Sequence, residues 1–233
     1  MWGRETGSRH GPRPSLDLER ITAAAIEIAD ADGLAKVTMS SVASRMGVAT
    51  MTLYRYVGSK DELLVTMADA AAPEPPDPAG RPWREYLAEW TRANRDFYLA
   101  RPWMLYIARL TPPMGPRGLR WLDRAMAVLS STGLGEGEKI NIAATLTGYA
   151  SSQAGLTLQL TSGSVDGSGA GGPLGYANVL AEVLDADEYP ALSRAVSEGA
   201  FGEAEEWIED ADFVFGLNLL LDGIDTLIKS RRG

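Results

Sequence analysis

The sequence of 233 residues contains no cysteine and a single histidine, His10. The absence of cysteine excludes disulfide scaffolds, thiolate zinc sites, iron-sulfur clusters and cysteine nucleophiles. His10 lies in a Gly/Pro/Arg-rich stretch without apolar periodicity, so we do not expect a Ser-His-Asp triad or a histidine-ligated metal. We therefore predict no catalytic residue, no metal site and no cofactor.

Long apolar runs are missing as well. No stretch of 18 or more residues is uncharged and apolar enough to span a bilayer, and the first 15 residues lack the apolar core of a signal peptide. A glycine-rich nucleotide fingerprint is also absent. These absences predict a cytoplasmic protein that is not an enzyme and has no membrane partner.

Positive charge is scarce, because 22 Lys and Arg stand against 31 Asp and Glu and give a net charge of -9. This balance excludes a protein that coats nucleic acid through bulk positive charge, so any nucleic-acid site must be local. The segment from Thr38 to Lys60 is the compact exception. It contains Arg45, Arg55 and Lys60 and no carboxylate.

Alternating Val/Ile/Thr patterns, which are typical of strands, do not occur, whereas apolar residues recur at steps of three and four. The sequence therefore predicts an all-α fold. Ser15 is a possible N-cap of the first helix, and Gly33 is its expected end. Five prolines between residues 73 and 82 predict a stiff linker. The predicted divisions are a disordered tail (1–15), an N-terminal unit (16–72), this linker (73–82) and a helical body (83–233), with a mobile loop at 161–172.

Residues 38–57 match a helix-turn-helix. Thr38 can cap a short helix, Gly47 can take the left-handed turn, and Leu53 and Val57 can anchor a second helix that leaves its polar residues facing outward. Ser59-Lys60-Asp61-Glu62 forms a capping box for the next helix, which places Lys60 and free backbone amides where a phosphate can bind.

At these positions the chain resembles the tetracycline-repressor (TetR) family. The resemblance covers residues 16 to about 72 and is carried by Thr38, Ala43, Gly47-Val48, Thr52-Leu53-Tyr54, Tyr56 and Ser59 to Leu64. It implies that three N-terminal helices bind DNA, that a fourth connects onward, and that a divergent helical body binds a small molecule and dimerises. It also implies phosphate contacts by Thr38, Ser40, Ser41, Tyr54, Tyr56 and Lys60, and base contacts by Thr50, Met51, Thr52 and Arg55. Two positions depart from the commonest pattern, with Ala49 in place of a capping serine and Val57 in place of phenylalanine.

The last helix has a continuous apolar seam. Its members follow each other at steps of three and four, as in a helix that packs along its whole length: Val214, Leu217, Leu221, Ile224 and Ile228. The seam is compatible with the central helix of a monomer or with a homodimer. We favour a homodimer joined by a four-helix bundle, because two helix-turn-helix units read two half-sites about 34–36 Å apart.

The helix predicted at 136–161 carries polar residues at every fourth position on an apolar background. Together with aromatic and Met residues of neighbouring helices they form a candidate ligand pocket, although such stripes are also common in plain cores: Trp103, Met104, Tyr106, Trp121, Met126, Asn141, Thr145, Tyr149 and Gln153. Residues 81–124 contain nine arginines and four carboxylates. These arginines favour an anionic ligand or, alternatively, pair with the acidic C-terminal helices.

The leading prediction is a ligand-responsive, sequence-specific transcriptional regulator. Its expected partners are a near-palindromic double-stranded DNA operator, an unknown small-molecule effector that releases a repressor from that operator, and a second copy of the chain. One alternative is a small-molecule-binding or sequestering protein, or an enzyme, with a vestigial DNA-binding domain. Another is a constitutive DNA-binding protein that has no effector.

Overall fold

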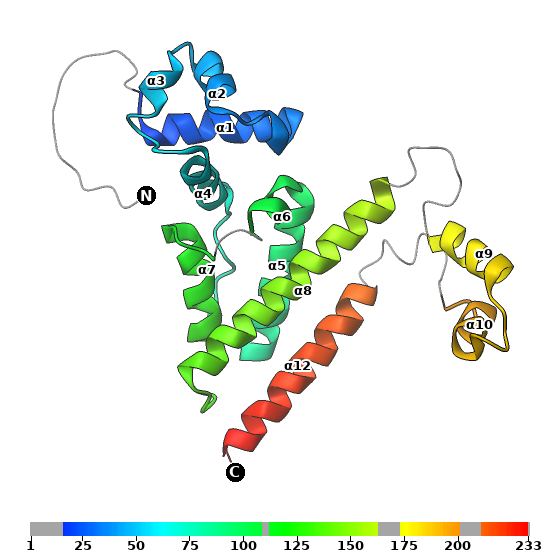
Figure 1. Ribbon diagram of the computed structural model, residues 1–233. Coiled ribbons are helices and arrows are strands. Elements are labelled where there is room, and N and C mark those ends of the chain that lie inside the picture. Colours follow the sequence, from blue (N-terminus) through cyan, green and yellow to red (C-terminus); the bar gives the residue numbers. More distant parts are fainter. Residues whose placement is uncertain (1–15, 109–111, 163–172, 201–210, 233) are drawn as a thin grey trace.

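The computed structural model describes residues 16–108, 112–162, 173–200 and 211–232, and all regular elements in these ranges are helical (Figure 1). This confirms the predicted all-α class. The expectations for the tail, for His10 and for most of the loop at 161–172 lie outside the described residues. The α-helices are α1 (Leu18–Asp32), α2 (Met39–Met46), α3 (Thr50–Leu53), α4 (Lys60–Ala71), α5 (Trp83–Ala100), α6 (Trp103–Ala108), α7 (Pro116–Ala127), α8 (Glu136–Ser162), α9 (Pro173–Val183), α10 (Pro190–Ser197) and α12 (Ala211–Arg232).

Helices α1 to α4 form the N-terminal unit, and local caps fix their ends. Asp17 caps α1, because its carboxylate accepts a hydrogen bond from the Arg20 amide at 2.8 Å; this corrects the expectation for Ser15. Gly33 ends α1 with φ of 83°, and Gly47 ends α2 in the left-handed region with φ of 67°, as predicted. A capping box between Thr38 and Ser41 starts α2.

The second helix of the helix-turn-helix is short. Ala49 offers no side-chain cap, and α3 ends at Leu53 before a turn that leads to Val57. Leu53 and Val57 are both fully buried, as predicted. The missing cap leaves the first amides of α3 without a side-chain acceptor, which is consistent with a helix held by its buried anchors rather than by its own end.

The N-terminal unit shares its apolar core with the C-terminal body. Leu63 and Met67 of α4 belong to a cluster that contains α1 to α3 and also Tyr98 of α5, Met104 of α6 and Ala154 of α8. A polar link from α6 to α1 reinforces this packing, since the indole of Trp103 donates to Asp30 Oδ1 at 2.7 Å. Helix α4 is therefore packed on both sides, against α1 to α3 and against the body.

The proline-rich connection between α4 and α5 is held along its length. The indole of Trp121 donates to the Pro73 carbonyl at 2.8 Å, and the Tyr86 hydroxyl donates to the Pro76 carbonyl at 3.0 Å. Arg124 donates to the Pro75 and Pro76 carbonyls at 2.7 and 2.9 Å. Burial of Tyr86 raises its pKa to about 12, so the hydroxyl stays protonated and remains a donor.

A second apolar core joins α5, α7, α8 and α12. The apolar seam predicted on the last helix packs into this core. Four members of that seam are buried inside the chain's own core, where they face α5 and α8 rather than solvent: Leu217, Leu221, Ile224 and Ile228. Val214 is half-buried against the same core. The seam therefore packs within one copy of the chain, and its role in a dimer interface stays a prediction.

Candidate DNA-binding surface and effector cavity

The outward face of α3 and the turn after it carries the side chains that sequence reasoning assigned to DNA. Met51 is 74% exposed, and Tyr54 and Tyr56 are 45% and 43% exposed. Arg55 lies between the two tyrosines and is also exposed. An exposed methionine, two phenol hydroxyls and a guanidinium give a short surface that can meet both base edges and phosphates.

The side-chain hydroxyls at the start of α2 differ in whether they are already hydrogen-bonded within the chain. Thr38 Oγ1 accepts from the Ser41 amide at 3.0 Å, and Ser41 Oγ accepts from the Thr38 amide at 2.9 Å and donates to the Lys36 carbonyl at 2.8 Å. Both hydroxyls therefore serve the capping box. Ser40 is exposed and makes no side-chain hydrogen bond within the described ranges, so it is the hydroxyl of this turn that is free for a phosphate.

The cations of the segment also differ in their availability. Arg45 pairs with Glu27 of α1 at 3.0 Å and so faces α1. Arg55 and Lys60 are exposed and form no ion pair with any described residue. Lys36 has the same properties and lies two residues before the cap of α2. Sequence reasoning missed it because the basic segment was counted from Thr38, although a helix N-terminus favours anions and Lys36 adds a positive charge close to one.

A cavity of about 600 Å³ lies next to the N-terminal unit, a size typical of small-molecule sites. Helix α4 forms one wall, α5 and α6 form others, and α7, α8 and the segment from Pro112 to Gly115 complete it. The lining is largely aromatic and aliphatic: Val65, Ala68, Asp69, Ala72, Trp90, Asn94, Phe97, Tyr98, Met104, Leu105, Ile107, Pro112, Pro113, Met114, Gly115, Gly118, Trp121, Leu122, Ile140, Ala143, Ala144, Thr147, Gly148 and Ser151.

Two of the nine predicted pocket residues, Met104 and Trp121, line this cavity. The other seven lie outside this cavity, and their role in ligand binding stays a prediction. Trp103 is buried against α1, Tyr106 is 62% exposed, and Met126 and Gln153 lie half-buried away from the cavity. Tyr149 stacks on Phe213 of α12 at 5.3 Å between ring centroids. Asn141 and Thr145 line a separate groove.

Helical geometry explains why the predicted polar row on α8 does not line this cavity. Residues four apart follow one stripe, and the stripe through Asn141, Thr145 and Tyr149 faces α12. Thr147 and Ser151, which follow Thr145 and Tyr149 by two residues and so lie on another side of α8, line the cavity instead. Periodicity identified a polar stripe but did not determine which neighbouring helix it contacts.

Two polar side chains of α5 that sequence reasoning missed line the cavity. Asn94 and Tyr98 lie one helical turn apart, and their residues are only 8% and 6% exposed. The Asn94 amide nitrogen donates to the Trp90 carbonyl at 3.0 Å, which leaves its oxygen as a free acceptor. The Tyr98 hydroxyl has no hydrogen-bond partner in the described part of the chain, and burial raises its pKa. The i, i+4 spacing of this pair on the buried face of an amphipathic helix was visible in the sequence.

The arginines of residues 81–124 do not favour an anionic ligand in this cavity. No Lys or Arg in the described ranges contributes to its wall. Arg84 pairs with Asp222 of α12 at 2.6 Å, and Arg120 pairs with Glu74 at 2.6 Å. Arg117 and Arg124 donate to backbone carbonyls. Of these four arginines, Arg84 pairs with the acidic C-terminal helix as the alternative interpretation expected, whereas the other three bind the end of α4 and the proline-rich connection.

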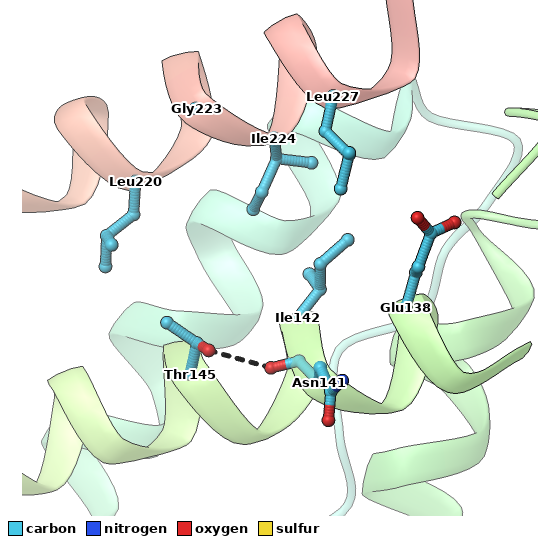
Figure 2. A pocket seen from close by; sticks show the side chains of 8 residues that line it. All are labelled: Glu138, Asn141, Ile142, Thr145, Leu220, Gly223, Ile224 and Leu227. Carbon is cyan, nitrogen blue, oxygen red and sulfur yellow. Dashed lines mark hydrogen bonds between the residues drawn. The ribbon is translucent and has the colours of Figure 1, made fainter. Parts of the chain in front are cut away.

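A second, smaller groove of about 310 Å³ lies at the surface between α8 and α12. Figure 2 shows Leu220, Ile224 and Leu227 of α12 facing the α8 residues across it. Its α8 wall includes Asn141 and Thr145, and the Thr145 hydroxyl donates to the Asn141 carbonyl at 2.8 Å. Next to this groove, Phe215 and Leu219 of α12 are 69% and 59% exposed.

No helix in the described ranges has the length and apolar character needed to cross a membrane. A helix-turn-helix on a shared core with a cavity-bearing helical body defines the class of two-part helical DNA-binding regulators. The family model of the C-terminal domain called tetracyclin repressor-like matches residues 74–228, and that of bacterial regulatory proteins, tetR family, matches residues 21–67. The chain belongs to this family.

The similar proteins agree with this assignment. The chain is 33% identical to the HTH-type transcriptional repressor DrrR1 of Streptomyces coeruleorubidus, over all of this chain and 86% of DrrR1. ActR of Streptomyces coelicolor in complex with actinorhodin superimposes with a TM-score of 0.75 and 26% identity, over 92% of this chain and 99% of ActR. BioQ of Mycobacterium smegmatis gives a TM-score of 0.61 at 23% identity, over 90% of this chain and 97% of BioQ, which shows a shared fold.

Proposed function

We propose that the protein is a transcriptional repressor that leaves its operator when a small molecule occupies the 600 Å³ cavity. The observation that carries the proposal is the double role of α4. Val65, Ala68 and Asp69 of α4 line the cavity, while Leu63 and Met67 of the same helix pack into the core of the DNA-binding helices. A ligand that moves this wall also moves the DNA-binding surface. DrrR1, a repressor, and ActR, which binds actinorhodin, support both halves of the proposal.

A reciprocal junction between α4 and α7 is the expected transmission element. Asp69 Oδ1 accepts hydrogen bonds from the Arg117 and Gly118 amides at 3.0 and 2.8 Å, which caps α7 with a carboxylate. In return, the Arg117 guanidinium donates to the Ala70 and Ala72 carbonyls at 2.8 and 3.1 Å, at the end of α4. Asp69, Ala72 and Gly118 also line the cavity, so a ligand contacts the junction directly.

The energy that such a switch requires is modest. A differential affinity of about 1–3 kcal/mol between the two states changes operator affinity by about 5- to 150-fold. The four junction hydrogen bonds, two of them to a carboxylate and two from a guanidinium, supply a contribution of this order when they form in one state and not in the other.

Selection of the purified protein on random duplex DNA at physiological salt tests the DNA half. We expect enrichment of an inverted repeat, which the double variant Arg55→Ala, Tyr56→Ala loses while remaining folded. A folded wild-type sample that enriches no sequence contradicts the proposal and favours a ligand-sequestering protein with a vestigial DNA-binding unit.

We further propose that the regulator is a homodimer, joined through the exposed faces of α8 and α12. Phe215 and Leu219 present apolar side chains to solvent, and the groove beside them offers a seat for the equivalent residues of a second copy. A two-fold axis there allows both helix-turn-helix units to read one inverted repeat.

Sedimentation of Leu219→Glu tests the interface. We expect this variant to be monomeric at concentrations where the wild type is dimeric, because the substitution places a charge in an apolar contact. Val183→Glu is the matched control, since Val183 of α9 is 67% exposed and lies away from this face. Equal behaviour of the two variants contradicts the proposed surface.

A further inference from the structure

Asp30 lies in the last turn of α1, where the helix itself gives a carboxylate no support. The negative end of a helix dipole disfavours acidic side chains, and the last turn of α1 contains no basic residue. The partners of Asp30 come from the body instead. The indole of Trp103 donates to Asp30 Oδ1 at 2.7 Å, and the Arg101 guanidinium lies 3.3 Å from the same oxygen. The body therefore explains the position of this carboxylate, and α1 alone does not.

Both partners of Asp30 are held firmly within the body. Trp103 is only 8% exposed, and a buried donor that loses its acceptor is unfavourable. Arg101 ends α5, where its amide donates to the Phe97 carbonyl at 3.0 Å and its own carbonyl accepts from the Met104 amide at 2.9 Å. These backbone bonds fix the turn between α5 and α6. The two donors are thus in place whether or not Asp30 is bound.

Asp32 is the natural comparison, because it belongs to the same turn of α1. It is exposed and makes no hydrogen bond or ion pair within the described ranges. The two aspartates share the helix end and its unfavourable dipole, and they differ in that Asp30 contacts the body. Contact with the body is therefore the property that sets Asp30 apart.

The contact at Asp30 attaches the N-terminal unit to the body at a different helix from the junction at α4. That junction joins α4 to α7 through Asp69 and Arg117. In Figure 1, α7 lies below α4, and α6 lies below the end of α1. A unit attached at one helix can pivot about it, whereas attachments at two helices remove this rotation.

The orientation of the N-terminal unit decides where its DNA-binding surface lies. Helix α2 packs against α1, and α3 packs against α2, so both move with α1. In a dimer, two such surfaces must match half-sites about 34–36 Å apart. A small rotation of each unit on its body changes this separation.

From these observations we infer that Asp30, Trp103 and Arg101 form a positioning joint, which fixes the orientation of the DNA-binding unit on the body and thereby selects the spacing between operator half-sites. This inference rests on the proposed function, since only a DNA-binding dimer has half-sites to space. The three residues act through the placement of α2 and α3 and touch no DNA themselves.

Pulsed electron paramagnetic resonance measures this orientation without DNA. The chain has no cysteine, so Ser44→Cys on α2 and Asp123→Cys on α7, both at exposed positions, place one spin label on each part. Dilution with unlabelled protein restricts the signal to distances within one chain. We expect a narrow distance distribution for this labelled parent. It should broaden after Trp103→Phe, which keeps the ring and removes the donor, and after Asp30→Ala, which removes the acceptor.

Two further variants separate the joint from a general effect on α1. Asp32→Ala is the matched control and should leave the distance distribution of the labelled parent unchanged. Asp30→Asn keeps an oxygen acceptor for the indole and removes the ion pair with Arg101, so it should broaden the distribution less than Asp30→Ala. Urea titrations check that each variant is folded.

Operator spacing is measured on the repeat that the wild type enriches from random duplex DNA. To bind a duplex whose half-sites are further apart by a single base pair, the wild type must strain the joint. Because hydrogen bonds to charged groups are the stronger kind, Trp103→Phe and Asp30→Ala should reduce the preference for the correct spacing by about tenfold. The preference for bases within each half-site should not change, and Asp32→Ala should discriminate as the wild type does.

The results distinguish this inference from the proposed function. Distance distributions of Trp103→Phe and Asp30→Ala that equal those of the parent or of Asp32→Ala overturn the inference, whatever the DNA selection shows. Broadened distributions with an unchanged spacing preference also overturn it, because the joint then does not select the spacing. If the distributions broaden as expected but the wild type enriches no DNA sequence, the orienting role of the joint stands and the repressor function fails.

Discussion

The DNA-binding surface and the effector cavity are built in opposite ways. The surface comes from one continuous segment, residues 36–60, whose caps, turn and buried anchors are set by near neighbours. The cavity draws its wall from α4, α5, α6, α7 and α8, with lining residues from Val65 to Ser151. A substitution in the local site alters one contact at a time. A substitution in the cavity wall also alters the packing of its helices against other parts of the protein. Helix α4 is the place where the two kinds of site meet.

The largest expected effect separates the buried residues of α3, which stabilise the fold, from its exposed residues, which face outward. Leu53→Ala removes a fully buried anchor and should lower the free energy of unfolding by about 2–5 kcal/mol in urea titrations. Met51→Ala, at a position that is 74% exposed, should leave this value unchanged and alter base preference instead. Similar stability losses in both variants would show that α3 is not anchored as the structure indicates.

Within the DNA surface, base reading and phosphate binding should separate. Arg55→Ala is expected to relax base preference, with a cost of about 1–3 kcal/mol at the affected position. Lys60→Ala should weaken binding to all sequences alike and lower the salt dependence by about one unit. Titrations of cognate and scrambled duplexes at several salt concentrations distinguish the two effects. Equal loss of specificity in both variants contradicts this division.

The α4–α7 junction tests whether the two regions are coupled. Asp69→Asn weakens a charged cap of α7 that is worth about 0.5–2 kcal/mol, so hydrogen exchange at the Arg117 and Gly118 amides should become about 2- to 30-fold faster. Ligand-induced release from the operator should become weaker in the same variant. Asp123→Asn is the matched control, because Asp123 is an exposed aspartate of α7 outside the cavity. If both variants change hydrogen exchange and ligand-induced release equally, the junction does not couple the cavity to DNA binding.

The smallest expected effect concerns an exposed contact between the start of α8 and the end of α12. Hydrogen bonds from Arg231 and from the Gly135 amide hold the pKa of Glu138 below its usual value of 4.5. Because the folded pKa is lowered, the pair stabilises the fold above that usual value, and the contribution is lost as the pH falls through the lowered pKa. Urea titrations at about pH 7 and about pH 3 should show a smaller pH dependence for Glu138→Gln than for Glu85→Gln. An identical pH dependence of the two variants would mean that this contact does not contribute to the free energy of unfolding.

Prediction from sequence succeeded where structure follows from neighbours along the chain. Thr38, Gly47 and the pair Leu53 and Val57 were identified because caps, left-handed turns and i, i+4 anchors depend on residue type at short separation. Ala49, which stands in place of a capping serine, likewise gives α3 no side-chain cap in the structure. The family resemblance rested on these same residues, and it extended to the fold of the body without locating the pocket.

The sequence by itself determined an all-α chain, a helix-turn-helix with its outward residues, and the presence of apolar and polar stripes on α8 and α12. Tertiary structure alone decided what each stripe contacts. The seam of Leu217 and Ile228 turned inward to α5 and α8, and the polar row of Asn141 faced α12 while Asn94 and Tyr98 faced the cavity. The reason is physical: periodicity gives the angle of a side chain around its own helix, whereas the neighbour it meets depends on how several distant helices share two cores.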